Sequence, residues 1–190
     1  MSFFFRRYNH FAHKHPLATN IATTGFLFGA GDFLAQQLEL RHVAPGTAES
    51  TKSGVYDMPR TARAVAYGLL VFGPMAGTWF GFLSRFAPGK SAATNTLARV
   101  ALDQGVFAPF IGIPLYFLCM TAMEAPQDIG AAITSKLNHT WWETVRANWA
   151  VWPAVQIVNF ALVPVQFRLV AVNLVGIGWN CYLSMENSEK

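Results

Sequence analysis

Four long hydrophobic stretches divide the chain of 190 residues. They cover residues 17–38, 64–86, 100–123 and 149–183. Each of the first three is long enough for one α-helix across the roughly 30 Å hydrocarbon core of a bilayer. The fourth suits either one kinked passage with an extension or two short helices, with Pro164 as its natural break. The pattern predicts an all-α, multi-pass transmembrane helical bundle of about four passages, forming a single membrane domain over residues 1–190.

The segments between these stretches are typical of turns and membrane boundaries. A flexible linker is predicted over residues 43–56, and Pro126 opens a more polar segment that continues to residue 140. Four tryptophans then stand where an aromatic belt at a membrane–water interface would lie. They are Trp141, Trp142, Trp149 and Trp152. Basic residues divide almost evenly between the two sides of such a bundle, so charge does not predict its orientation.

Composition supports a membrane environment. Hydrophobic residues make up 53% of the chain and charged residues 13%, about half the charged share of a soluble domain. The formal net charge is +4, but the basic residues are scattered and form no patch suited to nucleic acid. We therefore expect the lipid bilayer as the main partner and no direct contact with nucleic acid.

Small residues recur at helical spacing in the first two stretches. Gly25 and Gly29 lie four residues apart, and Gly73, Gly77 and Gly81 form a doubled GxxxG pattern. In lipid, apolar side chains give no preference for a neighbouring helix over a lipid tail, so small residues that allow close approach mark helix contacts. We interpret these glycines as packing surfaces.

A polar residue recurs every seven positions in the last stretch. The series is Asn159, Gln166, Asn173 and Asn180, with Gln156 on the same side as Asn159. If this stretch is helical, such a stripe faces protein or water rather than lipid. Hydrogen bonds between helices and the lining of a solute pathway both explain it, and the sequence favours neither.

Three ionisable residues fall within or beside the hydrophobic stretches: Asp32, Asp103 and Arg168. An unpaired charge at such a depth costs at least ~2.5 kcal/mol. Arg99 and Asp103 are four residues apart and could pair with each other. Arg168 has no acid close by in the sequence, so Asp32 or Asp103 is its expected counter-ion. A salt bridge that fixes helix register is favoured over a charged constriction or gate.

Candidate catalytic and metal-binding chemistry is sparse. His10, His13 and His15 lack carboxylates or cysteines at ligand spacing, and no nucleophile, phosphate-binding or zinc motif is present. Cys119 and Cys181 are more simply two thiols in apolar stretches, although a redox pairing of the two stays open. We expect no catalytic residue, no metal and no cofactor, and hence a protein that is not an enzyme.

Motifs spread over nearly the whole chain resemble a known family. They include His15-Pro16, Gly31-Asp32, Asp57, Arg60, Gly73-Pro74, Asp103-Gln104, Trp149, Trp152-Pro153, Gln156, Asn159-Phe160, Pro164, Arg168 and Trp179-Asn180. In this order they look like the eukaryotic family of small membrane proteins named for Mpv-seventeen and the peroxisomal membrane protein PMP-twenty-two.

Two features resemble the mitochondrial inner-membrane branch of that family. Gly77 stands where many members have histidine, and residues 60–65 and 148–153 look especially like the yeast member of the branch. The N-terminal arm is also basic, with no acid before Asp32, which suits mitochondrial import. The expected location is the mitochondrial inner membrane, with the peroxisomal membrane as the alternative.

The resemblance implies a function as well as a fold. It implies four membrane passages with both termini on one side, and a weakly selective channel for small metabolites. It also implies effects on stress tolerance, carbon metabolism and the maintenance of mitochondrial DNA. The resemblance does not identify the transported solute. A homo-oligomer or a larger membrane complex is compatible with the resemblance. The alternative is a non-conducting scaffold or assembly factor whose buried polar groups only hold helices together.

Overall fold

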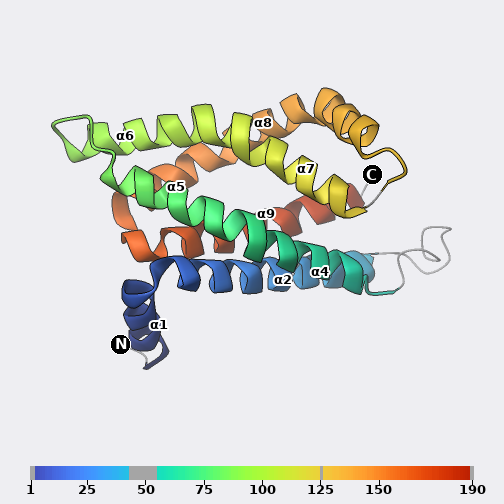
Figure 1. The fold of residues 1–190 in the computed structure, drawn as a ribbon, viewed down its shortest axis with the longest axis horizontal. Coiled ribbons are helices and arrows are strands. Elements are labelled where there is room, and N and C mark those ends of the chain that lie inside the picture. The colour runs from blue at the N-terminus through green and yellow to red at the C-terminus, as the bar shows by residue number, and fades with distance from the viewer. Residues whose placement is uncertain (1–2, 43–54, 125, 189–190) are drawn as a thin grey trace. The chain divides into compact units, whose positions relative to one another are not determined.

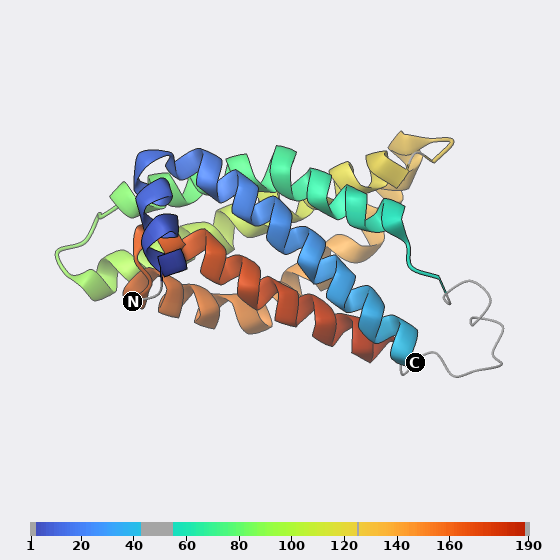
Figure 2. The same cartoon turned by 90° about the horizontal axis from the view of Figure 1, so that it is seen from below.

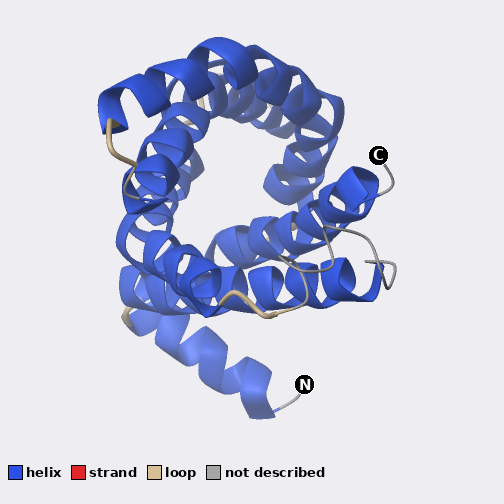
Figure 3. Cartoon of the chain, turned by 90° about the vertical axis from the view of Figure 1, so that its right-hand side faces the viewer, coloured by secondary structure: helices blue, strands red, loops and turns tan. Residues whose placement is uncertain are grey.

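The computed structural model describes residues 3–42, 55–124 and 126–188, with side-chain positions for residues 7–8, 10–40, 55–124 and 126–178. Throughout the described chain the regular elements are helices, so the all-α prediction is confirmed (Figures 1 and 3). Contacts divide the chain into two units. One comprises residues 1–79 and 169–190, and the other comprises residues 80–168.

The first unit is built around α2 (Pro16–His42). The short helix α1 (Phe3–Lys14) packs at its beginning, and α2 lies between α4 (Met58–Tyr67) and α9 (Arg168–Ser188) (Figure 2). The start of α4 is fixed locally, because Asp57 Oδ1 accepts a hydrogen bond from the Arg60 backbone N–H at 2.9 Å. A wider π-helical turn, η1 (Gly68–Phe72), then leads into α5 (Gly73–Arg85).

The second unit contains the end of α5 and the helices that follow it. These are α6 (Ala92–Leu102), the π-helical segment η2 (Asp103–Gly112), α7 (Ile113–Glu124), α8 (Ile129–Leu162) and the short turn η3 (Val165–Phe167). Side chains cap two of the helix starts. Ser91 Oγ accepts from the Thr94 N–H at 3.1 Å, and Asp128 Oδ1 accepts from the Ala131 N–H at 2.9 Å. Both α7 and α6 pack against α8.

Two continuous helices in the described part of the chain are long and apolar enough to cross a membrane. One runs from Met58 to Arg85 and the other from Ala92 to Glu124. Their most apolar 18-residue windows have mean hydropathies of 1.3 and 1.9. Only 28% and 11% of their most apolar windows are buried within the protein. The core helix of a soluble protein hides its apolar side chains, whereas these helices expose theirs, as expected of surfaces that face lipid.

The four predicted passages are therefore supported only in part. Residues 17–38 do lie in one long helix, α2, but its second half carries Asp32, Gln36 and Gln37, which lower its hydropathy. It is not among the two apolar helices identified in the described residues. The stretch over residues 149–183 is divided between α8 and α9, and its shorter apolar helical part covers Val165–Gly178.

The predicted kink at Pro164 is a complete break between helices. Helix α8 ends at Leu162, and Val163 adopts an extended backbone with φ −88° and ψ 126°. A residue before proline avoids the α conformation, because the proline ring collides with its backbone. Residues 129–140 of the polar segment are helical and form the first part of α8, with Asp128 as the N-cap. Of the predicted linker at residues 43–56, residues 43–54 lie outside the described chain.

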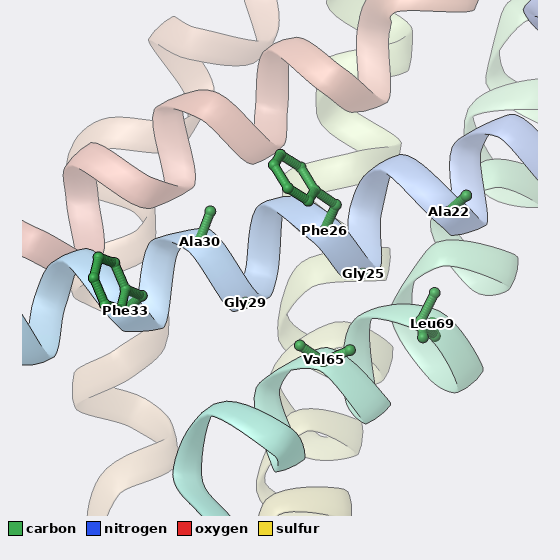
Figure 4. A pocket seen from close by; sticks show the side chains of 8 residues that line it. All are labelled: Ala22, Gly25, Phe26, Gly29, Ala30, Phe33, Val65 and Leu69. Atoms are coloured by element: carbon green, nitrogen blue, oxygen red, sulfur yellow. The ribbon is translucent and has the colours of Figure 1, made fainter. Parts of the chain in front are cut away.

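Glycines in the first unit lie where two helices approach closely. A Cβ atom at Gly29 would lie 2.7 Å from Val65 Cγ2, and one at Gly25 would collide with Leu69. Figure 4 shows these residues at an apolar groove between α2 and the helix that begins at Met58. The other members of the groove are Ala22, Phe26, Ala30 and Phe33.

The second glycine series is less uniform than its spacing predicts. A Cβ at Gly73 would lie 3.0 Å from the Ile21 Cα, and one at Gly77 would lie 3.2 Å from Leu17 Cδ1. A Cβ at Gly81, by contrast, would meet no heavy atom within 4 Å among the described residues. The spacing alone does not distinguish Gly81 from the other two, because it does not reveal where the neighbouring helix ends.

We expect Gly73→Ala to destabilise the protein and Gly81→Ala not to do so. The new methyl group at position 73 would lie 2.7 Å from the Gly68 carbonyl oxygen and would press on the α2 backbone. Overpacking of this kind costs about 1–3 kcal/mol. At position 81 the higher helix propensity of alanine predicts a change from zero to about 1 kcal/mol of stabilisation. Thermal unfolding in detergent measures both, and equal midpoints for the two variants would contradict the close approach at Gly73.

Candidate functional site

Asp103 lies at the centre of a hydrogen-bonded group in the second unit. We call this group the Asp103 cluster; its members are Asp103, Gln104, Asn148, Gln156 and Asn159. Asp103 Oδ2 accepts from Gln104 Nε2 at 2.7 Å and from Gln156 Nε2 at 2.8 Å. Asn159 Nδ2 donates to Gln156 Oε1 at 2.9 Å, and Asn148 Nδ2 donates to Gln104 Oε1 at 2.7 Å. The cluster thus ties the beginning of η2 to α8.

Four members of this cluster are deeply buried, and two of these, Asp103 and Gln104, lie in the more apolar of the two spans. Asp103 and Gln156 are each 3% exposed, and Asn159 is 2% exposed. Hydrogen bonds are strong in such a medium, and a buried polar atom without a partner is correspondingly costly. One atom of the cluster is in that position, since Asn159 Oδ1 accepts no hydrogen bond from the described residues.

Prolines explain why this part of η2 needs partners from another helix. In a π-helix the N–H of residue i+5 donates to the carbonyl of residue i. The donors for the carbonyls of Gln104 and Pro109 would be residues 109 and 114, both prolines without an N–H. Indole groups replace them: Trp149 Nε1 donates to the Gln104 carbonyl and Trp141 Nε1 to the Pro109 carbonyl, each at 2.8 Å.

Trp141 and Trp149 therefore join α8 to η2. The sequence predicted a different role for them, as part of an aromatic belt at the membrane–water interface. Both lie on α8, and both satisfy carbonyl groups that the prolines leave without donors. Trp142 is 51% exposed and meets the Trp149 ring edge-on, with 5.9 Å between ring centres. The sequence pattern located the tryptophans beside the apolar stretch, but it could not show which indole N–H groups point inward.

A second polar group lies in the first unit, between α2 and α4. We call it the Asp32 cluster; its members are Asp32, Gln36, Glu39, Arg60 and Thr61. Arg60 Nε donates to Asp32 Oδ1 at 2.7 Å, and its two terminal nitrogens donate to Glu39 at 2.7 and 3.0 Å. Gln36 and Thr61 donate to Asp32 Oδ2 at 2.7 and 2.6 Å. The Asp32 side chain is 11% exposed, against 36% for Arg60, so Asp32 depends most on these bonds.

Arg168 occupies the break between α8 and α9. Its Nε donates to the Val163 carbonyl at 3.1 Å and its Nη2 to the Phe160 carbonyl at 3.2 Å. The end of a helix leaves carbonyls without N–H partners, and a cation is favourable there. Arg168 is only 7% exposed, yet its Nη1 has no hydrogen-bond partner among the described residues.

The predicted ion pairs take a different form in the structure. Asp32 pairs with Arg60, while Asp103 accepts from two glutamine amides. Within residues 80–168, no described carboxylate lies within salt-bridge distance of Arg168, which donates to backbone carbonyls instead. Arg99 likewise donates to the carbonyls at the end of α5. Sequence reasoning sought only carboxylate partners and overlooked carbonyls released by a proline break.

The polar stripe of the last hydrophobic stretch is divided between the two units. Gln156 and Asn159 belong to the Asp103 cluster, while Asn173 Nδ2 donates to Thr24 Oγ1 of α2 at 2.9 Å. Gln166 lies in the turn η3 and is half-buried. The side chains of Asn180 and Cys181 lie outside the described side chains.

Several residues of these clusters had no role in the sequence-based site. Gln104, Asn148, Glu39 and Arg60 are all hydrogen-bonded to predicted site residues or to their partners. Three of them did carry a signal. Gln104 follows Asp103, and Arg60 belongs to a motif of the family resemblance. Asn148 lies in the segment 148–153 that carries part of the family resemblance, whereas Glu39 carried no signal because its partner comes from a distant part of the chain.

The chemistry available here is hydrogen bonding and charge. Among the described residues no group of three His, Cys, Asp or Glu side chains is placed to hold a metal ion. The Asp103 cluster offers one carboxylate, several amides and one open acceptor, and Arg168 offers an open donor. Such groups can hold water or a polar solute.

Comparisons with known proteins agree with the family resemblance. The sequence model of the Mpv17 / PMP22 family matches residues 129–184, which include most of α8 and α9. Three similar fungal relatives are each named Protein SYM1. The one from Debaryomyces hansenii is 44% identical over 97% of this chain and 88% of that protein. The one from Gibberella zeae is 43% identical over the full length of both chains, or 100% of each.

The third relative, from Saccharomyces cerevisiae, is 43% identical over 93% of this chain and 86% of that protein. These similarities confirm the predicted family and its predicted yeast-like branch. No solved structure matches the chain.

We expect Trp149→Phe to destabilise the second unit more than Trp142→Phe. Phenylalanine retains most of the aromatic contact but removes the N–H that satisfies the Gln104 carbonyl. Leaving that carbonyl without a partner in an apolar site costs about 1–3 kcal/mol. Trp142 is 51% exposed and Trp149 42%, so burial does not separate them, and the larger effect at position 149 comes from its indole hydrogen bond. Thermal unfolding in detergent gives the comparison, and a smaller effect at position 149 than at 142 would contradict the proposed role of the indole N–H.

Proposed function

We propose, from the premise that the chain belongs to the Mpv17 / PMP22 family of membrane proteins, that it is a weakly selective channel for small metabolites in the mitochondrial inner membrane. The proposal extends to the physiological roles that the resemblance implies, namely support of stress tolerance, carbon metabolism and mitochondrial DNA maintenance. We propose no catalytic role. The polar residues of the second unit provide the physical support for a pathway.

One observation carries the channel proposal. The second unit buries three polar atoms that have no partner among the described residues: the acceptor Asn159 Oδ1, the donor Arg168 Nη1 and the Thr121 hydroxyl. Buried polar atoms in proteins nearly always have a partner, and water supplies it where protein does not. Open polar atoms within so apolar a protein therefore favour a hydrated interior, which a channel requires and a dry helix contact does not.

The candidate pathway includes the Asp103 cluster and Arg168. Asp103 supplies negative charge, Gln156 and Asn159 supply amide groups, and Arg168 supplies positive charge. Groups of both signs suit a weakly selective pore better than a strongly selective one, because neither cations nor anions meet a uniform ring of charge.

A scaffold or assembly factor is the second candidate, and a specific observation favours it. Most buried polar side chains are bonded to protein, as in the Asp103 cluster and the Asn173–Thr24 contact. Such bonds stabilise helix association without any pathway. The two functions differ in whether water and ions reach the second unit.

Ion conductance of the purified full-length protein in planar bilayers tests the channel proposal. We expect discrete conductance steps, and Asp103→Asn should shift the ion preference toward anions because it removes negative charge. Asp128→Asn is the matched control. Asp128 is an exposed acid of the same unit, and asparagine retains its N-cap role at α8.

The outcomes separate the two candidates. Absence of conductance from folded protein would reject the channel and leave the scaffold. Conductance whose ion preference is equal in Asp103→Asn and Asp128→Asn would place the pathway elsewhere in the molecule.

Fractionation tests the proposed compartment. Helix α1 is basic and free of acidic residues, and its exposed side chains include Arg7, His10 and Lys14, which suits mitochondrial import. We therefore expect tagged protein to follow inner mitochondrial membrane markers and to remain with the membrane after alkaline carbonate washing. Replacing both Arg6 and Arg7 with glutamine should reduce import. Tagged parent protein that follows peroxisomal markers would overturn the location.

A further inference from the structure

Two arginines of the second unit cap the ends of two helices. Arg99 Nε donates to the Phe86 carbonyl at 3.0 Å, and its Nη2 donates to the Ser84 carbonyl at 3.3 Å, at the end of α5. Arg168 does the same at the end of α8. In each arginine the two hydrogen bonds of the cap come from Nε and Nη2, and Nη1 takes no part in the cap.

The two capped helix ends lie next to each other. The ring of Phe80 on α5 meets the ring of Phe160 on α8 edge-on, with 5.9 Å between ring centres. The Arg168 guanidinium carbon lies 5.5 Å from the centre of the same Phe160 ring. Arg99 is close enough to repel Arg168 electrostatically. Two like charges are thus held near each other by their carbonyl partners.

The surrounding chain carries an excess of positive charge. Residues 80–102 and 144–168 include no acidic residue. Their basic residues are Arg85, Lys90, Arg99, Arg146 and Arg168. Asp103, one helical turn beyond Arg99, already accepts two glutamine amide bonds. This neighbourhood attracts anions.

An open donor completes the arrangement. Arg168 is 7% exposed, and its Nη1 has no partner among the described residues. Arg99 is half-buried near the α5–α6 connection, so its own guanidinium is in part exposed to solvent. A guanidinium group matches the planar arrangement of oxygens in a carboxylate or phosphate.

We infer that Arg99 and Arg168 form a binding site for an oxyanion, the carboxylate or phosphate group of a small solute. This inference rests on the proposed channel function and gives its solute a chemical class, that of anionic metabolites. Binding of the oxyanion supplies a partner to Arg168 Nη1 and offsets the repulsion between the two guanidinium groups. The helix caps remain in place because they use other nitrogens.

Isothermal titration of the full-length protein in a neutral detergent tests the site. The probes are inorganic phosphate and succinate, each at constant ionic strength. We expect both to bind the parent and Arg85→Gln with equal affinity, and to bind Arg99→Gln about 10-fold more weakly or worse, because a charged hydrogen bond is lost. Arg85 is the matched control, since it is exposed at the end of the same helix α5.

Arg168→Gln should abolish binding as well. The Arg168→Gln substitution also removes the cap of α8, so this variant could fail to fold. In that case Arg99→Gln carries the test. Absence of binding to the parent, or equal affinity in Arg99→Gln and Arg85→Gln, would overturn the inference.

A lipid headgroup is the other source of the same chemistry. Phosphatidylglycerol in mixed micelles forms the second arm of the titration. Binding of this lipid but of neither soluble probe, with the same dependence on Arg99, would overturn the solute assignment and identify a lipid site. The titration can be read without any measurement of conductance. Phosphate binding without conductance would reject only the channel. Conductance without phosphate binding would reject only this site.

Discussion

A bilayer offers no hydrogen-bond partner to a polar group, so every such group on an apolar helix must find one within the protein or in trapped water. In the second unit Gln104 shows how this constraint is satisfied, because three of its polar groups have partners on other residues. Its amide donates to Asp103, its side-chain carbonyl accepts from Asn148, and its backbone carbonyl accepts from Trp149. Two of these three bonds join η2 to α8, and the bond to Asp103 lies within η2. Pro109, which has no N–H, creates the need for the bond from Trp149, and α8 supplies the donor.

The first unit meets the same constraint with charge and with close packing. Glycines allow α2 to approach α4 and η1, which favours dispersion contacts that lipid tails cannot match. At the end of that contact, Arg60 bridges Asp32 and Glu39. The two carboxylates contribute unequally to stability. The side chain of Asp32 is 11% exposed and that of Glu39 33%, so water competes more effectively with Arg60 for Glu39. Stability in this unit therefore depends on Asp32 rather than on the number of ion pairs.

Local rules explain how much of this was predictable from sequence. Hydrophobic length predicted the helices, Pro164 predicted a break, and the four-residue spacing of Gly25 and Gly29 predicted a close helix contact. Partners across helices were less accessible, because helix register decides which side chains meet. Arg168 illustrates the difficulty, since its partners are carbonyls that exist only once α8 has ended at Leu162. Trp149 is a second case, because its acceptor depends on a proline five residues beyond Gln104.

The distinction between a helix clamp and a solute pathway depends on polar atoms that the clamp leaves open. A network in which every donor meets an acceptor gains nothing from water, and water can be excluded from it. Among its described residues the second unit falls short of that state at three buried atoms, one of them the Thr121 hydroxyl. The other two are an acceptor, Asn159 Oδ1, and a donor, Arg168 Nη1. Both belong to residues whose other polar atoms are bonded to protein, so the open atoms are held in place rather than free to turn toward one another. Under the channel proposal, rigidly held open atoms of opposite kind would provide stepping points for water or a polar solute. Leaving them open costs free energy, and a purely structural contact has no reason to retain that cost.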